Sequence, residues 1–285
     1  MQALCCALQD TSVLVQRSFL DFLLLGFAMN NRQLTRPDMV KLVTAAIHTV
    51  LRRDMSLNRR LFAWFLGQGT SGIPAPSTLN MNNNDHVASG APYFNAYSRD
   101  NLISAIRSVL LDFEGVDPLH PERNANLKPF RILISMLDKP DIGPAIIEDV
   151  LVDVFRCLYR ECEESRTAPS RAGAKKESGF SQRNDEKSIT ELLKTANLLF
   201  GTFEPYYLWD FIARKFEEVI GSIKKAPVVA ANVDRRGMIP SRVLAVTELC
   251  QLVDFLVDRV SLVSSAVSST TNDKFLIILL FSFQH

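Results

Sequence analysis

The segment from Thr35 to Gly67 limits the possible folds of this chain more than any other. It reads TRPDMVKLVTAAIHTVLRRDMSLNRRLFAWFLG, and its apolar residues recur at the spacing that lines one face of an α-helix. Thr35 can cap a helix, Pro37 suits the first turn, where backbone amides lack partners, and Gly67 can end a helix. The segment therefore predicts two helices joined by a short turn.

The turn between these helices is predicted to be tight. We expect Asp54 and Met55 to form it and Ser56 to cap the second helix. Two helices joined in this way are predicted to pack antiparallel. Both have apolar faces broader than a single partner can cover, with Leu42 widening the first and Phe62 the second. This breadth indicates a helix pair in the middle of a stack.

Helical periodicity continues along the rest of the chain, and no segment alternates in the manner of a strand. The run SITE at Ser188–Glu191 is a capping box and predicts a helix start at Ser188. Pro129, Pro205 and Pro240 are predicted to open three further helices. Segments rich in glycine, proline or polar residues are predicted to be loops: 67–97, 165–186 and 221–238.

These elements predict an all-α fold. Recurring helix pairs without a fixed sequence period favour a HEAT- or armadillo-like α-solenoid of antiparallel helix pairs with long irregular loops. A compact helical bundle is the alternative. We expect helical repeats over 1–164, a flexible linker over 165–187, continuing helical repeats over 188–262 and a divergent tail over 263–285.

Charge and cysteine content narrow the class of protein. Thirty-two Lys and Arg against thirty-one Asp and Glu leave a net charge of +1, which argues against a nucleic-acid binder with a broad basic face. The five cysteines are odd in number and lack paired spacing, so we expect reduced core residues of a cytosolic protein. The apolar runs 19–27 and 275–283 are too short to span a membrane.

Sequence motifs of catalysis are missing. The chain has no phosphate-binding loop, dinucleotide fingerprint, HExxH run or nucleophile elbow, so we expect no enzyme and no cofactor. Its four histidines are scattered without ligand spacing, which predicts no metal site and a partly buried, hydrogen-bonded role for His48. Two other classes stay open: an enzyme with a perturbed acid pair in a deep pocket, and a nucleic-acid-binding solenoid with a continuous basic stripe.

One group of charged residues is a candidate interaction site. Arg52, Arg53, Arg59 and Arg60 flank the predicted turn and could contact an acidic partner or an anionic lipid headgroup. The alternative is structural, because arginines complement a helix C-terminus and pair with acids of neighbouring repeats. A generic α-solenoid adaptor that binds acidic partners or anionic phospholipid headgroups is the function that this group would support.

Long runs of this sequence resemble the N-terminal region of the Dopey family, in family order and over about residues 4–260. The runs that carry the resemblance are DTSVLVQRS at 10–18, LTRPDM at 34–39, VLRRDMSLNRRLFAW at 50–64, LKPFRILISMLDKP at 127–140, EDVLVDVFRCLY at 148–159 and LLKTANLLFGTFEPYYLWDFIARKFEE at 192–218.

The resemblance implies a non-catalytic scaffold in membrane and protein traffic between endosomes and the Golgi. It implies protein partners, namely an ARF-exchange-factor-like scaffold and a phospholipid flippase, and no nucleic acid. It also implies a peripheral membrane protein of the cytosol and the cytosolic face of Golgi and endosomal membranes. We expect the isolated segment to stay in the cytosol and the full-length protein to reach membranes through its partners and its other regions.

Overall fold

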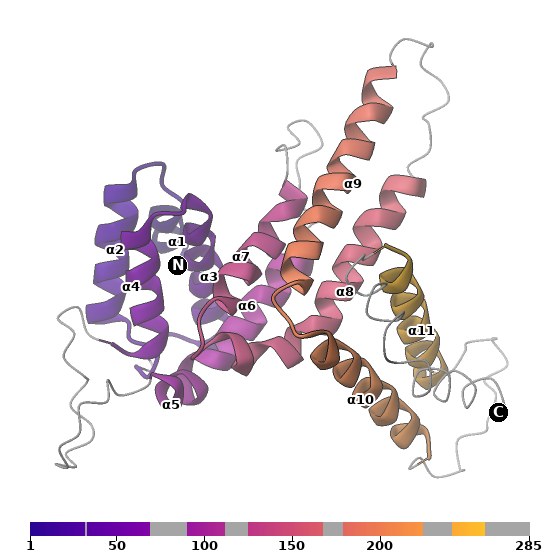
Figure 1. Cartoon of the computed structure of the whole chain (residues 1–285). Coiled ribbons are helices and arrows are strands. Elements are labelled where there is room, and N and C mark those ends of the chain that lie inside the picture. Colours follow the sequence, from indigo (N-terminus) through magenta and orange to yellow (C-terminus); the bar gives the residue numbers. More distant parts are fainter. Residues whose placement is uncertain (32, 69–89, 112–124, 168–178, 225–240, 260–285) are drawn as a thin grey trace, which may run out of the picture. The chain divides into compact units, whose positions relative to one another are not determined.

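The described part of the chain is helical, as expected, and contains no β-strand (Figure 1). It divides into two compact units, Met1–Cys157 and Leu158–His285. The all-α prediction is confirmed. The structure, a computed structural model, describes residues 1–31, 33–68, 90–111, 125–167, 179–224 and 241–259.

The described residues of unit 1 form α-helices, some of which are preceded or followed by a short 3-10 or π-helical turn. In chain order they are α1 (Gln2–Leu8), α2 (Val13–Gly26), α3 (Arg36–Ile47), η1 (His48–Arg52), α4 (Met55–Leu66), α5 (Ala91–Tyr93), η2 (Phe94–Ser98), α6 (Arg99–Leu111), η4 (Ala125–Leu127), α7 (Lys128–Leu137) and α8 (Gly143–Thr167), which continues into unit 2.

Helices α3 and α4 match the two helices predicted from the Thr35–Gly67 segment. Their main packing partners differ from the prediction, because α3 lies chiefly against α6 and α4 chiefly against α2. The broad apolar faces explain this arrangement. Leu42, Val43 and Ala46 of α3 are all buried, and so are Leu61 and Phe65 of α4, so each helix needs a large partner surface beyond the other.

The connection between α3 and α4 is longer than predicted, because α3 ends at Ile47 and the 3-10 helix η1 precedes α4. The Asp54 carboxylate accepts hydrogen bonds from the backbone amides of Ser56 at 2.8 Å and Leu57 at 3.0 Å, so Asp54 is the cap and Ser56 lies inside α4. The prediction of Ser56 as the cap was wrong because one carboxylate oxygen reaches both amides. The Ser56 hydroxyl and the Leu57 amide hold the pKa of Asp54 below its usual range. Arg53, with φ of 56°, reverses the chain just before the cap.

The predicted loop 67–97 is shorter than expected. Gly67 ends α4 in the left-handed conformation, as predicted, and residues 69–89 lie outside the described residues. The chain is helical again from Ala91, because Pro92 occupies the first turn, where its missing amide costs no hydrogen bond. The π-helical turn η2 then places the Ser98 hydroxyl 2.6 Å from the Phe65 carbonyl oxygen, to which it donates.

Two arginines of α6 tie that helix to α8 within unit 1. Arg99 donates from Nε to the Ala145 carbonyl at 2.8 Å and forms an ion pair with Asp149. Two turns further on, Arg107 forms an ion pair with Asp153, with Nε and Oδ2 2.9 Å apart. These contacts fix the register of the two helices with polar groups that stay partly exposed.

The described residues of unit 2 form the end of α8 and three further helices, and α10 contacts α11. Buried side chains from each of the three helices form its core, among them Leu199, Phe211 and Leu256. The three helices are α9 (Gly179–Phe200), α10 (Pro205–Lys224) and α11 (Ser241–Arg259).

The helix boundaries in unit 2 correct three predictions. Helix α8 extends to Thr167 and α9 begins at Gly179, so both ends of the predicted linker 165–187 are helical and Ser188 lies inside α9. Residues 180–187 include several good helix formers, whose intrinsic preference favours a helix that begins before Ser188. Likewise α10 continues through Gly221 to Lys224. The middle of the linker, the loop remainder and the tail 263–285 lie outside the described residues.

Trp64 is the largest buried side chain of unit 1. It is 1% exposed, stacks on Phe65 with ring centroids 5.6 Å apart, and donates from Nε1 to the Phe27 carbonyl oxygen at 2.8 Å. This indole therefore contributes both buried apolar area and a satisfied polar contact to the packing of α4 against the end of α2.

We expect Trp64→Ala to lower the free energy of unfolding by about 3–5 kcal/mol, because it leaves a cavity and an unpaired carbonyl. Urea unfolding would measure the loss. Tyr206→Ala is the control: this aromatic ring is 69% exposed on α10, and we expect its removal to cost less than about 0.5 kcal/mol. Equal midpoints for the two variants would contradict the assigned core.

Two glycine variants should change stability in opposite directions. A Cβ on Gly221 meets nothing within 4 Å in helix α10, so Gly221→Ala should stabilise by about 0.5–1 kcal/mol through the unfolded chain. A Cβ on Gly67 would lie 2.6 Å from Tyr93 Cγ, at a φ of +68°, so Gly67→Ala should destabilise. Thermal unfolding of both variants tests the pair. A loss of stability in Gly221→Ala would place that residue outside a regular helix.

Candidate interaction surface

The four arginines singled out from the sequence do not converge on one site. Arg52 Nη2 donates to the Asp10 carbonyl oxygen at 2.9 Å. Arg60 donates from Nε to Asp21 Oδ1 at 2.7 Å and from Nη1 to the Ser56 carbonyl at 3.1 Å. Arg52 and Arg60 therefore hold parts of unit 1 together, in agreement with the structural alternative.

The other two arginines present their charge to solvent. Arg53 and Arg59 are exposed, and within the described residues neither forms an ion pair. Met55 lies one helical turn before Arg59 on the same side of α4 and is 85% exposed. Arg53, Met55 and Arg59 make up the α4 tip, a small surface that combines two cations with an exposed thioether.

His48 is a structural histidine, as the sequence suggested. Its Nδ1 lies 2.7 Å from the Thr44 carbonyl oxygen, one turn earlier. Burial lowers the pKa of the His48 imidazole below 6.5, and the nearby Lys128 charge adds to the effect, while the contact with Thr44 opposes it. The neutral ring, donating from Nδ1, satisfies this contact.

The cysteines are free thiols, and only two of the five are buried. Cys157 and Cys162, both on α8, are buried, whereas Cys5 and Cys250 are partly exposed and Cys6 is exposed. The prediction of five core cysteines was therefore wrong for three of them. Burial raises the pKa of the Cys162 thiol to about 11 despite the charge of Arg259. A thiol with so high a pKa is a poor nucleophile at neutral pH.

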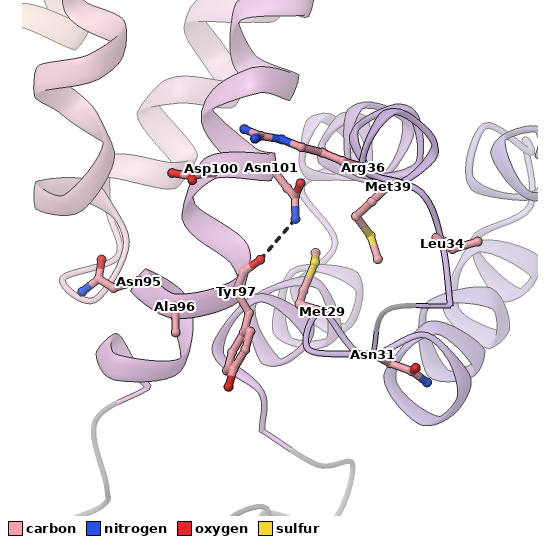
Figure 2. A pocket seen from close by; sticks show the side chains of 10 residues that line it. All are labelled: Met29, Asn31, Leu34, Arg36, Met39, Asn95, Ala96, Tyr97, Asp100 and Asn101. Carbon is pink, nitrogen blue, oxygen red and sulfur yellow. Dashed lines mark hydrogen bonds between the residues drawn. The ribbon is translucent and has the colours of Figure 1, made fainter.

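A pocket that the sequence did not indicate lies between the chain segment joining α2 to α3 and the segment η2–α6 (Figure 2). Its volume is about 440 Å³. Ten residues line it: Met29, Asn31, Leu34, Arg36, Met39, Asn95, Ala96, Tyr97, Asp100 and Asn101. They come from two stretches far apart in the sequence, and no spacing rule joins them.

Within the described ranges, no group of three or more His, Cys, Asp or Glu side chains is placed to hold a metal ion. None of the described helices is long and apolar enough to cross a membrane. Two surface features of the described residues are therefore candidates for binding: the α4 tip and the pocket.

These features define the class as an α-solenoid-type helical repeat protein. The chain belongs to the Dopey family. Residues 1–70 match the family model described as Dopey, N-terminal, and residues 93–263 match the model described as DOP1 middle TPR domain. Both stretches resemble the N-terminal region of the family in sequence, and the two models divide them between residues 70 and 93. No solved structure gave a significant match.

The chain is similar over most of its length to curated family members. It is 37% identical over 269 residues to Protein DOP1 homolog of Drosophila melanogaster, covering 92% of this chain and 9% of that protein. It is 34% identical over 275 residues to Protein DOP1B of Mus musculus, covering 92% of this chain and 12% of the mouse protein. The chain thus spans about a tenth of the length of the relatives it matches.

We expect the free energy of unfolding to fall as the pH drops below about 6.5, in part because of His48. The folded state lowers the pKa of this imidazole, so its contribution is complete above the unfolded pKa and is lost as the pH falls through the folded pKa. Urea unfolding at about pH 7.5 and about pH 5 measures the change.

His48→Gln should make this pH dependence shallower. The other three histidines are kept in that variant, so the difference between the two chains reports on His48 alone. The same slope in both would show that His48 is accessible to protons in the folded state.

Proposed function

We propose that this chain is a non-catalytic scaffold segment in membrane and protein traffic between endosomes and the Golgi, where it acts through protein–protein contacts. Membership of the Dopey family, with helical repeats over most of the chain, is the observation that carries the proposal. Stacked helices present extended surfaces for partners.

The partners that fit this role are an ARF-exchange-factor-like scaffold and a phospholipid flippase. The location that fits it is the cytosol together with the cytosolic face of Golgi and endosomal membranes. Membrane association is peripheral and depends on the full-length protein, because stable anchoring takes two signals and the α4 tip offers only a small cationic patch. Nucleic acid is not a partner, in keeping with a net charge of +1.

The α4 tip is the contact surface that we assign to this role. Among the four candidate arginines, Arg53 and Arg59 can contact a partner without giving up an intramolecular bond, whereas Arg52 and Arg60 cannot. An exposed thioether between two cations suits a partner that has an acidic rim and an apolar centre.

A generic adaptor that binds acidic partners or anionic phospholipid headgroups is the second candidate function. The same two exposed arginines favour it, because guanidinium groups bind carboxylates and phosphates equally well. The two functions differ in what is recovered with the chain: trafficking proteins in the first, and acidic ligands of any origin in the second.

Affinity capture from cells tests the proposal. We expect the tagged chain to recover proteins of endosome–Golgi traffic, including an ARF-exchange-factor-like scaffold, and we expect Arg53→Glu/Arg59→Glu to reduce that recovery at least about tenfold. The double variant spares Arg52 and Arg60, so helix packing is kept, and circular dichroism would verify this.

The matched control is Arg131→Glu/Lys187→Glu, which makes the same change of charge at two exposed positions elsewhere. Recovery should be unchanged in the control. Capture of no trafficking protein would contradict the proposed function. Equal recovery by both double variants would instead show that the α4 tip is not the contact surface. Binding of the chain to phosphatidylserine vesicles that is lost only in Arg53→Glu/Arg59→Glu would favour the generic adaptor.

A further inference from the structure

The pocket beside α3 combines an apolar floor with a polar rim. Met29 and Met39 are 7% and 5% exposed, and Figure 2 shows their sulfur atoms directed into the middle of the pocket. Leu34 completes the apolar part of the lining. Methionine side chains are flexible and polarizable, so this floor can accept apolar groups of different shapes.

The rim carries both charges and amide groups. Arg36, the first residue of α3, and Asp100, on α6, both line the pocket, and Asn101 directs its side-chain amide towards the middle of it. Figure 2 shows the Arg36 side chain extended across one side of the pocket towards Asn101. An arginine at the start of a helix lies beside backbone amides that also favour an anion.

Arg36 has its charge available. Within the described residues, no carboxylate forms an ion pair with Arg36, whereas Asp100 lies 3.4 Å from Arg99 Nη1. The nearest acid in the sequence, Asp38, instead accepts a hydrogen bond from Thr35 Oγ1 at 2.8 Å. The cation on the rim is therefore the group without a counter-charge.

The walls of the pocket are held in place by hydrogen bonds within the protein. The Asn30 amide donates to Tyr93 Oη at 3.2 Å, which attaches the α2–α3 connection to α5. Asn101 Nδ2 donates to the Tyr97 carbonyl oxygen at 3.1 Å, across the junction of η2 and α6, and the dashed line in Figure 2 marks this bond. A site formed before its ligand arrives loses little freedom on binding.

The π-helical turn η2 shapes the outer edge of the pocket. It buries Phe94 and Ser98 and leaves Asn95, Ala96 and Tyr97 exposed, with Tyr97 46% exposed. A π-helical turn inside an α-helical segment often occurs at functional sites. An exposed tyrosine beside a methionine floor is also a typical anchor for a partner protein.

We propose that this pocket binds a short peptide segment of a partner protein in which an apolar side chain stands next to an Asp or Glu. The apolar side chain fills the floor between Met29 and Met39, and the neighbouring carboxylate pairs with Arg36. Asn101 bonds to the peptide backbone, to which an amide can both donate and accept. Asp100 accepts from a backbone N–H of the same segment.

The chemistry of the lining favours a peptide over a phosphate headgroup. The thioether floor gives a phosphate headgroup no hydrogen bond, whereas it can hold the apolar side chain of a peptide. A volume of about 440 Å³ suits one or two side chains with their backbone. The proposal rests on the scaffold role, which it deepens by giving the partner a chemical signature.

Selection from a display library of short random peptides against the whole chain tests the proposal. We expect enriched peptides to share an aliphatic or aromatic residue beside Asp or Glu. Synthetic fluorescent copies, titrated by fluorescence anisotropy, should lose affinity about tenfold or more for Arg36→Glu and for a copy with the acid replaced by its amide. Ala96→Trp, at an exposed position on the mouth, should block binding.

Two matched controls separate the pocket from general effects. Arg131→Glu makes the same charge change at an exposed position of α7, and Leu198→Trp adds an exposed indole on α9, where Leu198 is 68% exposed. Both should bind as the unchanged chain does. Because the assay uses purified components, its failure leaves the recovery of trafficking proteins from cells unaffected.

The proposal is overturned if no peptide is enriched, if the enriched peptides lack the apolar–acidic pair, or if Arg36→Glu and Ala96→Trp bind them unchanged. Circular dichroism and thermal unfolding of each variant ensure that a loss of binding comes from the pocket and not from unfolding. Displacement of the peptides by phosphatidylinositol phosphate vesicles, with direct vesicle binding that needs Arg36, would also overturn it in favour of a lipid site.

Discussion

Burial of two unusually broad apolar helix faces is the constraint on which unit 1 depends. Helix α4 turns Trp64 and Phe65 towards α2, and α3 buries most of its length chiefly against α6. These faces are too broad for a single partner helix, so α3 also contacts α1 and α4 also contacts η2. The Trp64 indole adds a bond to the Phe27 carbonyl, which positions the connection to α3 that forms one wall of the pocket.

Polar contacts fix the alignment of neighbouring helices where apolar packing alone would allow several alignments. Arg99 and Arg107 bind α8 at two successive levels, and Asp54 fixes the first turn of α4. Because these groups stay partly exposed, each contributes little stability, but their geometry selects one alignment among several that bury similar apolar area. The surface left over, which includes the α4 tip and the pocket, is where we propose that partners bind.

Much of the fold could be predicted from local pattern, and the misses have a common cause. Helix periodicity identified the main helices because one turn of sequence carries the signal. The predicted helix starts were wrong where more than one start was compatible with the sequence. Ser56 and Ser188 can both cap a helix, but Asp54 caps α4 and α9 begins at Gly179. Capping propensity is too small to decide between neighbouring starts without the tertiary contacts of the helix.

The sequence by itself determined the all-α class, the family and the four candidate arginines, because each depends on residues that are neighbours along the chain. Only the tertiary structure decided that Arg52 and Arg60 are held by Asp10 and Asp21, and that Met29 and Asn101 face one pocket. The residues of each pair are far apart in sequence. They come together when the apolar helix faces are buried against one another, and no local pattern encodes which face packs against which.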